Sequence, residues 1–279
     1  MVKYIRISFF FLLICSLFAL NSCNNDIFGM FGSNDLSKRW QARNKFNFLT
    51  PAERNLATLG DTYSFIVLAD THIDDKNDLK LDKLKAVIEK SAIDGDEIKF
   101  VVISGDVTQK GERKEINKFI KQAGELGIPC YPVAGNHDVY FGNWPEWEKL
   151  IGSTIYRIDG GNTTLLILDS ATGFFGNKQL DWLEKELKTA GERVFVFTHY
   201  NVFVKSPTDI QQLTDIRERA RLTSILKDKC DIMFMGHLHK HIENKLGGVE
   251  YLAIEDYRDK AAYCLLKLHQ KKFLGKLII

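Results

Sequence analysis

Six short apolar runs constrain the fold of this chain more than any other feature. They are "YSFIVLAD", "KFVVISGD", "IPCYPVAGNHD", "TTLLILDS", "RVFVFTHY" and "CDIMFMGHLH", at residues 63–70, 99–106, 128–138, 163–170, 193–200 and 230–239. Continuous apolar runs of this length predict strands that are buried on both faces, as they are when helices cover a sheet. A chain with six such strands needs a second kind of element to cover them.

Amphipathic segments lie between several of these runs and predict helices. In residues 112–127, apolar side chains recur at helical spacing: Ile116, Phe119, Ile120 and Ala123. Helical patterns also cover residues 79–92, 177–191 and 215–229. This alternation of strands and helices indicates an α/β fold. The last forty residues differ, because "HIENKLGGVEYLAIE" and "AAYCLLKLHQKKFLGKLII" predict two antiparallel hairpins.

The first 22 residues have the organisation of a secretory signal. Basic "MVKYIR" precedes "ISFFFLLICSLFAL", fourteen residues without a charge. A membrane-spanning helix needs about 20 apolar residues, so a cleaved signal is favoured over the alternatives of a transmembrane anchor or a buried helix. The following "LNSC" resembles the lipobox of bacterial lipoproteins, which implies cleavage before Cys23 and a lipid on that cysteine.

These features predict three parts of the chain. We expect a lipoprotein signal peptide in residues 1–22, a lipid-anchored tether and lead-in in residues 23–60, and one large globular domain in residues 61–279. The lipid on Cys23 would hold the protein on a membrane of the bacterial cell envelope, outside the cytoplasm.

Charge and cysteine content exclude some classes of partner and site. Removal of residues 1–22 takes Lys3 and Arg6 from 38 basic residues and leaves 36, equal to the 36 acidic residues. A neutral chain gives no electrostatic reason to expect nucleic acid as a partner. Cys130, Cys230 and Cys264 lie in or beside apolar runs, so buried free thiols are favoured over a disulfide framework.

Side chains that can bind metal ions stand at the ends of five predicted strands. In chain order they are Asp70 and His72, then Asp106, then Asn136, His137 and Asp138, then His199, then His237 and His239. In open α/β sheets, ligands bind beyond the carboxyl ends of the strands. A single aspartate or histidine after a strand is more often a turn or structural residue. Five of the seven histidines fall at these ends, so the ordered set indicates a functional site.

This ordered set resembles the five-block signature of the calcineurin-like metallophosphoesterase superfamily, over about residues 63–255. The resemblance implies an α/β fold that is a four-layer sandwich, with two mixed β-sheets flanked by helices. It also implies a ligand set for two metal ions: Asp70, His72 and His239 for the first, Asn136, His199 and His237 for the second, and Asp106 between them. Carboxylate, amide and imidazole ligands suit two divalent ions of Mn, Fe or Zn.

The same resemblance implies hydrolysis of a phosphodiester or phosphomonoester by a metal-bound hydroxide. Asn136 would help to neutralise charge on the phosphoryl oxygens, and His137 would protonate the leaving group as a general acid. Asp138 would position the loop or the His137 imidazole, or else cap a turn. The alternative is a catalytically silent lipoprotein that binds metal or phosphate on the same scaffold.

Two details narrow the expected subfamily and the ligand set. Gln109 and Lys110 stand where protein phosphatases have an Asp–Arg pair, and Gln109 stands where purple acid phosphatases have an iron-binding tyrosine. The text of the motifs is closest to the bacterial cyclic-nucleotide-phosphodiesterase-like group, which implies a small-molecule phosphoester substrate. In "MGHLHKH", His237 and His239 are the expected ligands, and we expect His241 to lie outside the ligand set.

Overall fold

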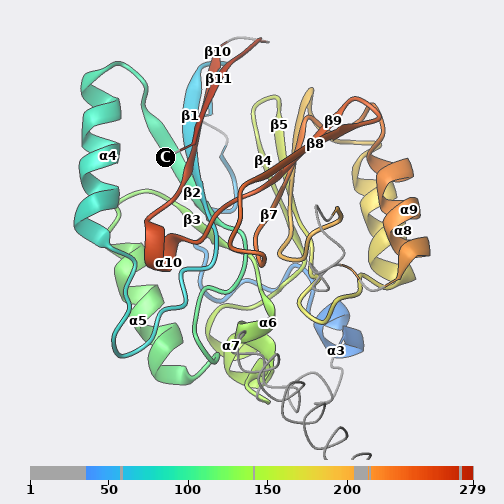
Figure 1. Ribbon diagram of the computed structural model, residues 1–279, viewed down its shortest axis with the longest axis horizontal. Helices are drawn as coiled ribbons and strands as arrows, with labels where there is room; N and C mark the ends of the chain where they lie inside the picture. The colour runs from blue at the N-terminus through green and yellow to red at the C-terminus, as the bar shows by residue number, and fades with distance from the viewer. Residues whose placement is uncertain are drawn as a thin grey trace, which may run out of the picture. The chain divides into compact units, whose positions relative to one another are not determined.

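The six predicted apolar runs form two mixed β-sheets in this computed structural model (Figure 1). The first sheet contains, in spatial order, β11 (Lys272–Ile278), β10 (Cys264–His269), β1 (Tyr63–Leu68), β2 (Ile98–Ile103) and β3 (Cys130–Pro132). The second contains β4 (Tyr156–Gly160), β5 (Thr163–Ile167), β6 (Arg193–Phe197), β7 (Ile232–Met235), β9 (Val249–Ala253) and β8 (Ile242–Leu246).

The structure describes residues 36–56, 59–140, 142–203, 213, 215–269 and 272–278. They belong to a unit that extends from Asn34 to Ile279. The predicted signal peptide, Cys23 and the first part of the predicted tether lie outside the described residues. No helix in the described ranges is both long and apolar enough to cross a membrane.

Parallel pairing in both sheets collects strand ends at one edge. Strands β1, β2 and β3 are parallel to one another, as are β5, β6, β7 and β9. The antiparallel pairs β8–β9 and β10–β11 are the two predicted hairpins, which are thereby confirmed. Parallel strands end at the same edge of a sheet, so the polar residues that follow β1, β2 and β3 are brought together, and so are those after β6 and β7.

Helices cover the outer face of each sheet. Cores of buried side chains join the first sheet to α4 (Leu81–Ile93), α5 (Arg113–Gly124) and α7 (Trp144–Leu150), and the second sheet to α8 (Asn177–Glu186) and α9 (Ile216–Leu226). Figure 1 shows α4 and α5 on one side of the sheets and α8 and α9 on the other. The predicted four-layer sandwich is therefore confirmed.

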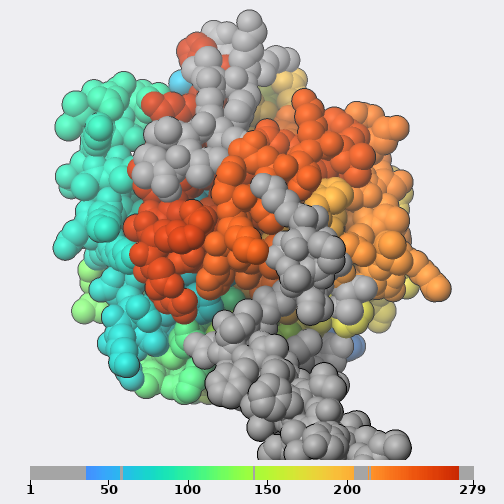
Figure 2. Space-filling model, in the orientation of Figure 1, coloured from blue at the N-terminus to red at the C-terminus, as the bar shows by residue number. Residues whose placement is uncertain are grey.

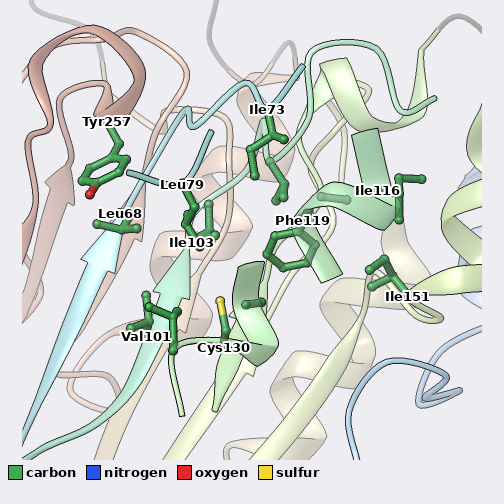
Figure 3. Close-up of a cluster of buried hydrophobic side chains, with 14 of the residues drawn as sticks. Leu68, Ile73, Leu79, Val101, Ile103, Ile116, Phe119, Cys130, Ile151 and Tyr257 are labelled. Atoms are coloured by element: carbon green, nitrogen blue, oxygen red, sulfur yellow. The ribbon is translucent and has the colours of Figure 1, made fainter. Parts of the chain in front are cut away.

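Each central strand buries both of its faces, which explains the continuous apolar runs. In β1, Phe65 and Val67 face the second sheet, and Ile66 and Leu68 face the helices. Figure 3 shows the helix-side layer, where Leu68 of β1 lies with Ile103 of β2 and Phe119 of α5. Because the side chains of a strand alternate between its faces, only a run without polar residues can fill both layers.

Phenylalanine side chains dominate the layer between the sheets. The ring of Phe65 stacks on that of Phe100 within the first sheet, with centroids 4.7 Å apart. It also meets the edge of Phe195 in the second sheet at 5.1 Å. Such aromatic pairs bury large areas and prefer these geometries. Five of the 19 phenylalanines in the chain are buried in this layer: Phe65, Phe100, Phe195, Phe197 and Phe234.

The C-terminal segments pack beside β1 in the first sheet. On the face in Figure 2, their red surface separates the cyan surface around α4 from the orange surface around α9. Strand β10 pairs with β1, and the short helix α10 (Tyr257–Lys260) begins with a hydrogen bond from the Tyr257 N–H to the Ala69 carbonyl. The end of the chain therefore packs against the strand that leads into Asp70.

Two helices end earlier than their glycines suggested, and several short elements, among them β4 and α7, were not predicted. Helix α5 ends at Gly124 rather than near Gly127, and α8 ends at Glu186 rather than at Gly191. Strand β4 and helix α7 have only five and seven residues, too few for a clear periodic signal. The three predicted free thiols, Cys130, Cys230 and Cys264, are all buried.

A buried ion pair joins the predicted lead-in to the segment that follows β5 of the second sheet. Arg39, in helix α3 (Leu36–Gln41), is 1% exposed, and its Nε donates to Asp169 Oδ2 at 2.6 Å. The same carboxylate oxygen accepts from the Thr154 hydroxyl at 2.6 Å, and Arg39 also donates to Thr172. Residues from Leu36 onward therefore pack as part of the domain.

Replacement of Arg39 by methionine tests this ion pair. The change leaves the Asp169 carboxylate buried without its cation, so we expect the free energy of unfolding to fall by about 3–5 kcal/mol. Urea unfolding measures the change. Lys45→Ala is the matched control: it removes an exposed pair with Glu148 and should change stability by about 0.5 kcal/mol or less. A loss below about 1 kcal/mol for Arg39→Met would contradict the structural role of the pair.

Candidate metal centre

The nine predicted site residues converge at the carboxyl ends of strands from both sheets. The first sheet supplies Asp70, His72, Asp106, Asn136, His137 and Asp138, and the second supplies His199, His237 and His239. All are buried except His239, whose side chain is 34% exposed. Neither sheet holds the complete set, so the site exists only where the two sheets meet.

Four ligand atoms surround one point beside His199. Its Nε2 lies 3.3 Å from Asp106 Oδ2, 3.0 Å from Asn136 Oδ1 and 3.1 Å from His237 Nδ1. Ligands about 2.1 Å from a metal ion lie roughly 3 Å from one another. The His199 ring is fixed by its other nitrogen, Nδ1, which is 3.1 Å from the Ser104 carbonyl oxygen. These residues can therefore hold a metal ion.

A second group of ligand atoms gathers around Asp70. His239 Nε2 lies 3.4 Å from Asp70 Oδ1, and His72 Nε2 lies 4.0 Å from the same oxygen. His72 Nε2 is also 3.7 Å from Asp106 Oδ2, the oxygen that faces His199. One carboxylate oxygen of Asp106 therefore lies between the two groups of ligands.

Unpaired buried nitrogens support a metal site at this place. Neither ring nitrogen of His72 has a hydrogen-bond partner in the described part of the chain, nor has Nε2 of His237. Buried polar atoms are nearly always paired, and the exceptions often mark a site for an ion. No cysteine lies among these ligands, and the mixture of oxygen and nitrogen donors suits a divalent transition ion.

The backbone is strained at five of the seven candidate ligands. Their φ angles are positive: 55° at Asp70, 44° at His72, 48° at Asp106, 72° at His237 and 51° at His239. Residues with a Cβ avoid this left-handed region, at a cost of about 1–3 kcal/mol each, and such strain clusters at functional sites. The turns after the strands thus adopt costly conformations that aim the ligands inward.

Two glycines allow close approach at the same place. A Cβ on Gly105, which has a φ of +91°, would overlap the His199 ring. A Cβ on Gly135 would overlap the Asp106 carboxylate, although the φ of Gly135 itself is an ordinary −101°. Gly135 is therefore required for space rather than for a turn.

The carbonyl of Gln109 orients His137, and Asp138 holds the surrounding loops. Nδ1 of His137 lies 2.7 Å from the Gln109 carbonyl oxygen, and its backbone N–H donates to Asp106 Oδ1 at 2.9 Å. The Asp138 carboxylate accepts from the N–H groups of Val107, Thr108 and Gly135 and from the Thr108 hydroxyl. Asp138 thus connects the turn after β2 to the turn after β3.

Burial and neighbouring charges shift the pKa values of the site histidines in opposite directions. Burial lowers the pKa of His72 to about 4 and, with the charge of His199, that of His237 to about 3. Burial also disfavours the charged form of His199, but the Asp106 carboxylate outweighs it and raises that pKa to about 9. Burial and the Asp106 charge raise the pKa of Asp138 to about 7.

Three residues around the ligands were not predicted as site residues. The Ser170 hydroxyl accepts the backbone N–H groups of His199 at 3.2 Å and Tyr200 at 2.9 Å. Asn201 donates its amide to the Gly236 carbonyl. Tyr140 follows helix α6 (Asn136–Val139), and its N–H donates to the Asn136 carbonyl. Ser170 ends a predicted strand, which was the one available sequence signal.

His241 lies apart from the ligand groups. Its Nε2 is 2.9 Å from a carboxylate oxygen of Glu243, and its side chain is 35% exposed. The three groups of His, Cys, Asp and Glu able to hold an ion within the described ranges include His237 and His239 but not His241. His237 and His239 therefore lie with the other candidate ligands, and His241 lies apart from them.

Comparison with known proteins gives the family. Residues 63–241 match the calcineurin-like phosphoesterase family. The chain belongs to this family. Its fold agrees, because it resembles a dimetal phosphatase from Danio rerio with a TM-score of 0.59 and 14% identity, over 79% of this chain and 99% of the other. The chain also resembles a purple acid phosphatase from yellow lupin, with a TM-score of 0.61 and 13% identity, over 80% of this chain and 54% of the other.

Two curated relatives are phosphodiesterases by name. The 3',5'-cyclic adenosine monophosphate phosphodiesterase CpdA of Pseudomonas aeruginosa is 25% identical over 67% of this chain and 74% of its own. The probable glycerophosphodiester phosphodiesterase GpdQ of Arcobacter nitrofigilis is 26% identical over 63% of this chain and 71% of its own. Family and relatives together make this metallophosphoesterase a phosphoric ester hydrolase, with residue clusters that can bind metal ions.

Metal affinity should rise with pH. His199, with a pKa near 9, is protonated at pH 7 in the metal-free protein, and a divalent ion binds only the unprotonated nitrogen. Because binding releases this proton, the apparent affinity for Mn²⁺ should increase by about tenfold per pH unit from pH 7 to 9, then level off. Calorimetric titration measures it. His241→Ala should show the same profile, and an affinity that is constant between pH 7 and 9 would contradict the assignment.

Proposed function

We propose that the protein hydrolyses a small-molecule phosphoester with two divalent metal ions, held by the two ligand groups that share Asp106. The observation that carries this proposal is the position of Asp106 Oδ2, 3.7 Å from His72 Nε2 and 3.3 Å from His199 Nε2. A shared carboxylate reduces the repulsion between two close cations. The ions, of Mn, Fe or Zn, would activate the attacking water and stabilise charge on the phosphoryl oxygens.

The side chains of the chain itself supply binding and proton transfer. The Asn136 amide, beside His199, can donate to a phosphoryl oxygen while its own oxygen serves as a ligand. The Gln109 carbonyl holds Nδ1 of His137 as an N–H, so proton exchange at this ring falls to Nε2. As the water oxygen joins phosphorus and the ester P–O bond breaks, His137 gives its Nε2 proton to the leaving alkoxide.

Several features support a diester rather than a protein phosphatase reaction. Gln109 and Lys110 replace the residues that are expected in protein phosphatases, and the names of the curated relatives refer to cyclic nucleotide and glycerophosphodiester substrates. We therefore propose a phosphodiester of a small molecule as the first substrate class to test, with phosphomonoesters as the comparison.

Replacement of His137 by alanine tests the proton transfer. The hydrolysis rate of a chromogenic phosphodiester with added Mn²⁺ should fall by about 10²–10⁴-fold, because the leaving group loses its acid. Elemental analysis should find the bound metal unchanged. His269→Ala is the matched control, since His269 lies far along β10 and contacts Thr62. An unchanged rate in His137→Ala would contradict the role of this histidine, and so would a parallel loss of metal.

We also propose that Cys23 carries a lipid that holds the enzyme in the bacterial cell envelope, outside the cytoplasm. Support comes from the sequence "LNSC" after the apolar run of residues 7–20. The domain would then meet its phosphoester beyond the cytoplasmic membrane.

Replacement of Cys23 by serine tests the anchor. The lipid should be lost, so the protein should no longer partition into detergent with the membrane fraction, while metal-dependent hydrolysis is unchanged. Cys130→Ser is the matched control for a buried cysteine that carries no lipid. Equal membrane partitioning of wild type and Cys23→Ser would contradict lipid anchoring at this residue.

A further inference from the structure

Two tyrosine hydroxyl groups meet beside the ligand group of Asn136, His199 and His237. Tyr140 and Tyr200 come from segments 60 residues apart, and their hydroxyl oxygens are 3.2 Å from each other. The Tyr200 ring stacks on the His237 imidazole, with centroids 4.0 Å apart and planes 24° apart. Tyr200 therefore adjoins two ligands of the same ion site: it follows His199 in the chain and stacks on His237.

The backbone holds both tyrosines in place. The Tyr140 N–H donates to the Asn136 carbonyl at 2.9 Å, and the Tyr200 N–H donates to the Ser170 hydroxyl at 2.9 Å. Tyr200 is only 8% exposed, and Tyr140 is half-buried. The backbone of both tyrosines is therefore held beside Asn136 and His199, and the Tyr200 ring packs on His237.

One of the two hydroxyl hydrogens is not used in the bond between the tyrosines. Each tyrosine hydroxyl has a single hydrogen, and a bond between two hydroxyls uses one of them. Within the described ranges, neither hydroxyl has another hydrogen-bond partner in the protein, so the second hydrogen is available to an acceptor that is not part of the pair. A phosphoryl group bound by the neighbouring ion would present such an acceptor.

A neutral donor suits this position. An arginine or lysine would be repelled by a divalent ion at His199 and His237, whereas a tyrosine hydroxyl adds a hydrogen bond without adding positive charge. Bonds from a neutral donor to a charged phosphoryl oxygen are stronger than bonds between neutral groups.

We propose that the Tyr140–Tyr200 hydroxyl pair donates a hydrogen bond to a non-bridging phosphoryl oxygen of the substrate bound at the ligand group of Asn136, His199 and His237. This inference rests on the proposed function and adds a substrate-binding contact to it. Neither tyrosine belongs to the five motif blocks, so this contact would lie outside the set of metal ligands.

Tyr140→Phe, Tyr200→Phe and the double variant test the proposal, with Tyr251→Phe as the matched control. Tyr251 is buried in β9, and its hydroxyl has no hydrogen-bond partner within the described ranges. For a chromogenic phosphodiester with Mn²⁺, each single variant should lose about tenfold in kcat/KM. The loss of kcat/KM in the double variant should not exceed that of the single variant with the larger loss, because the two hydroxyls act as one unit. Tyr251→Phe should stay within about twofold of wild type.

Binding of inorganic phosphate, measured by calorimetry on the Mn²⁺-loaded protein, is the second readout. It should weaken by about threefold or more in Tyr140→Phe and Tyr200→Phe at unchanged metal content. Values within twofold of wild type in both measurements would overturn the proposal. A loss of bound metal would also overturn it, since the tyrosines would then act through His237. A wild-type protein that turns over no phosphoester would refute the proposed function, and the phosphate measurement would still decide the role of the tyrosines.

Discussion

The contact between the two sheets is the interaction on which the site depends. Asp106 belongs to the first sheet and His199 to the second, and their side chains approach to 3.3 Å across the interface. The His237 N–H crosses the same interface to the Asp70 carboxylate. Behind these polar groups, rings such as Phe65 and Phe195 fill the space between the sheets. A close-packed interior cannot slide without loss of contacts, so the aromatic layer sets the spacing of the ligands.

The fold could be predicted, and the candidate ligands recognised, because both leave patterns in short stretches of the sequence. A strand buried on both faces must be continuously apolar, and polar residues at its end must face a common edge, so Asp70, Asp106 and His199 could be recognised. Contacts between distant residues leave no such pattern. Nothing periodic joins Arg39 to Asp169, 130 residues away, and nothing near Tyr140 indicates Tyr200.

The carboxylates of the site divide into two kinds. Asp106 presents an oxygen to histidines of both ligand groups, and its neighbours hold its pKa well below the usual range: burial opposes ionisation, but His199 and His137 outweigh it. Asp138 turns its carboxylate to backbone N–H groups, where burial and Asp106 raise its pKa. A position after a strand does not by itself separate these two aspartates, because the difference lies in which donors each one meets.

The positive φ angles at the ligands have an evolutionary consequence. Glycine would relieve the backbone at Asp70, His72, Asp106, His237 and His239, and in each case it would also delete a ligand. Selection for heat resistance alone would therefore favour substitutions that erase the centre, whereas selection for turnover must retain a less stable chain. Stability and chemistry compete here at the same five dihedral angles, and a lineage released from catalysis would be expected to lose these residues first.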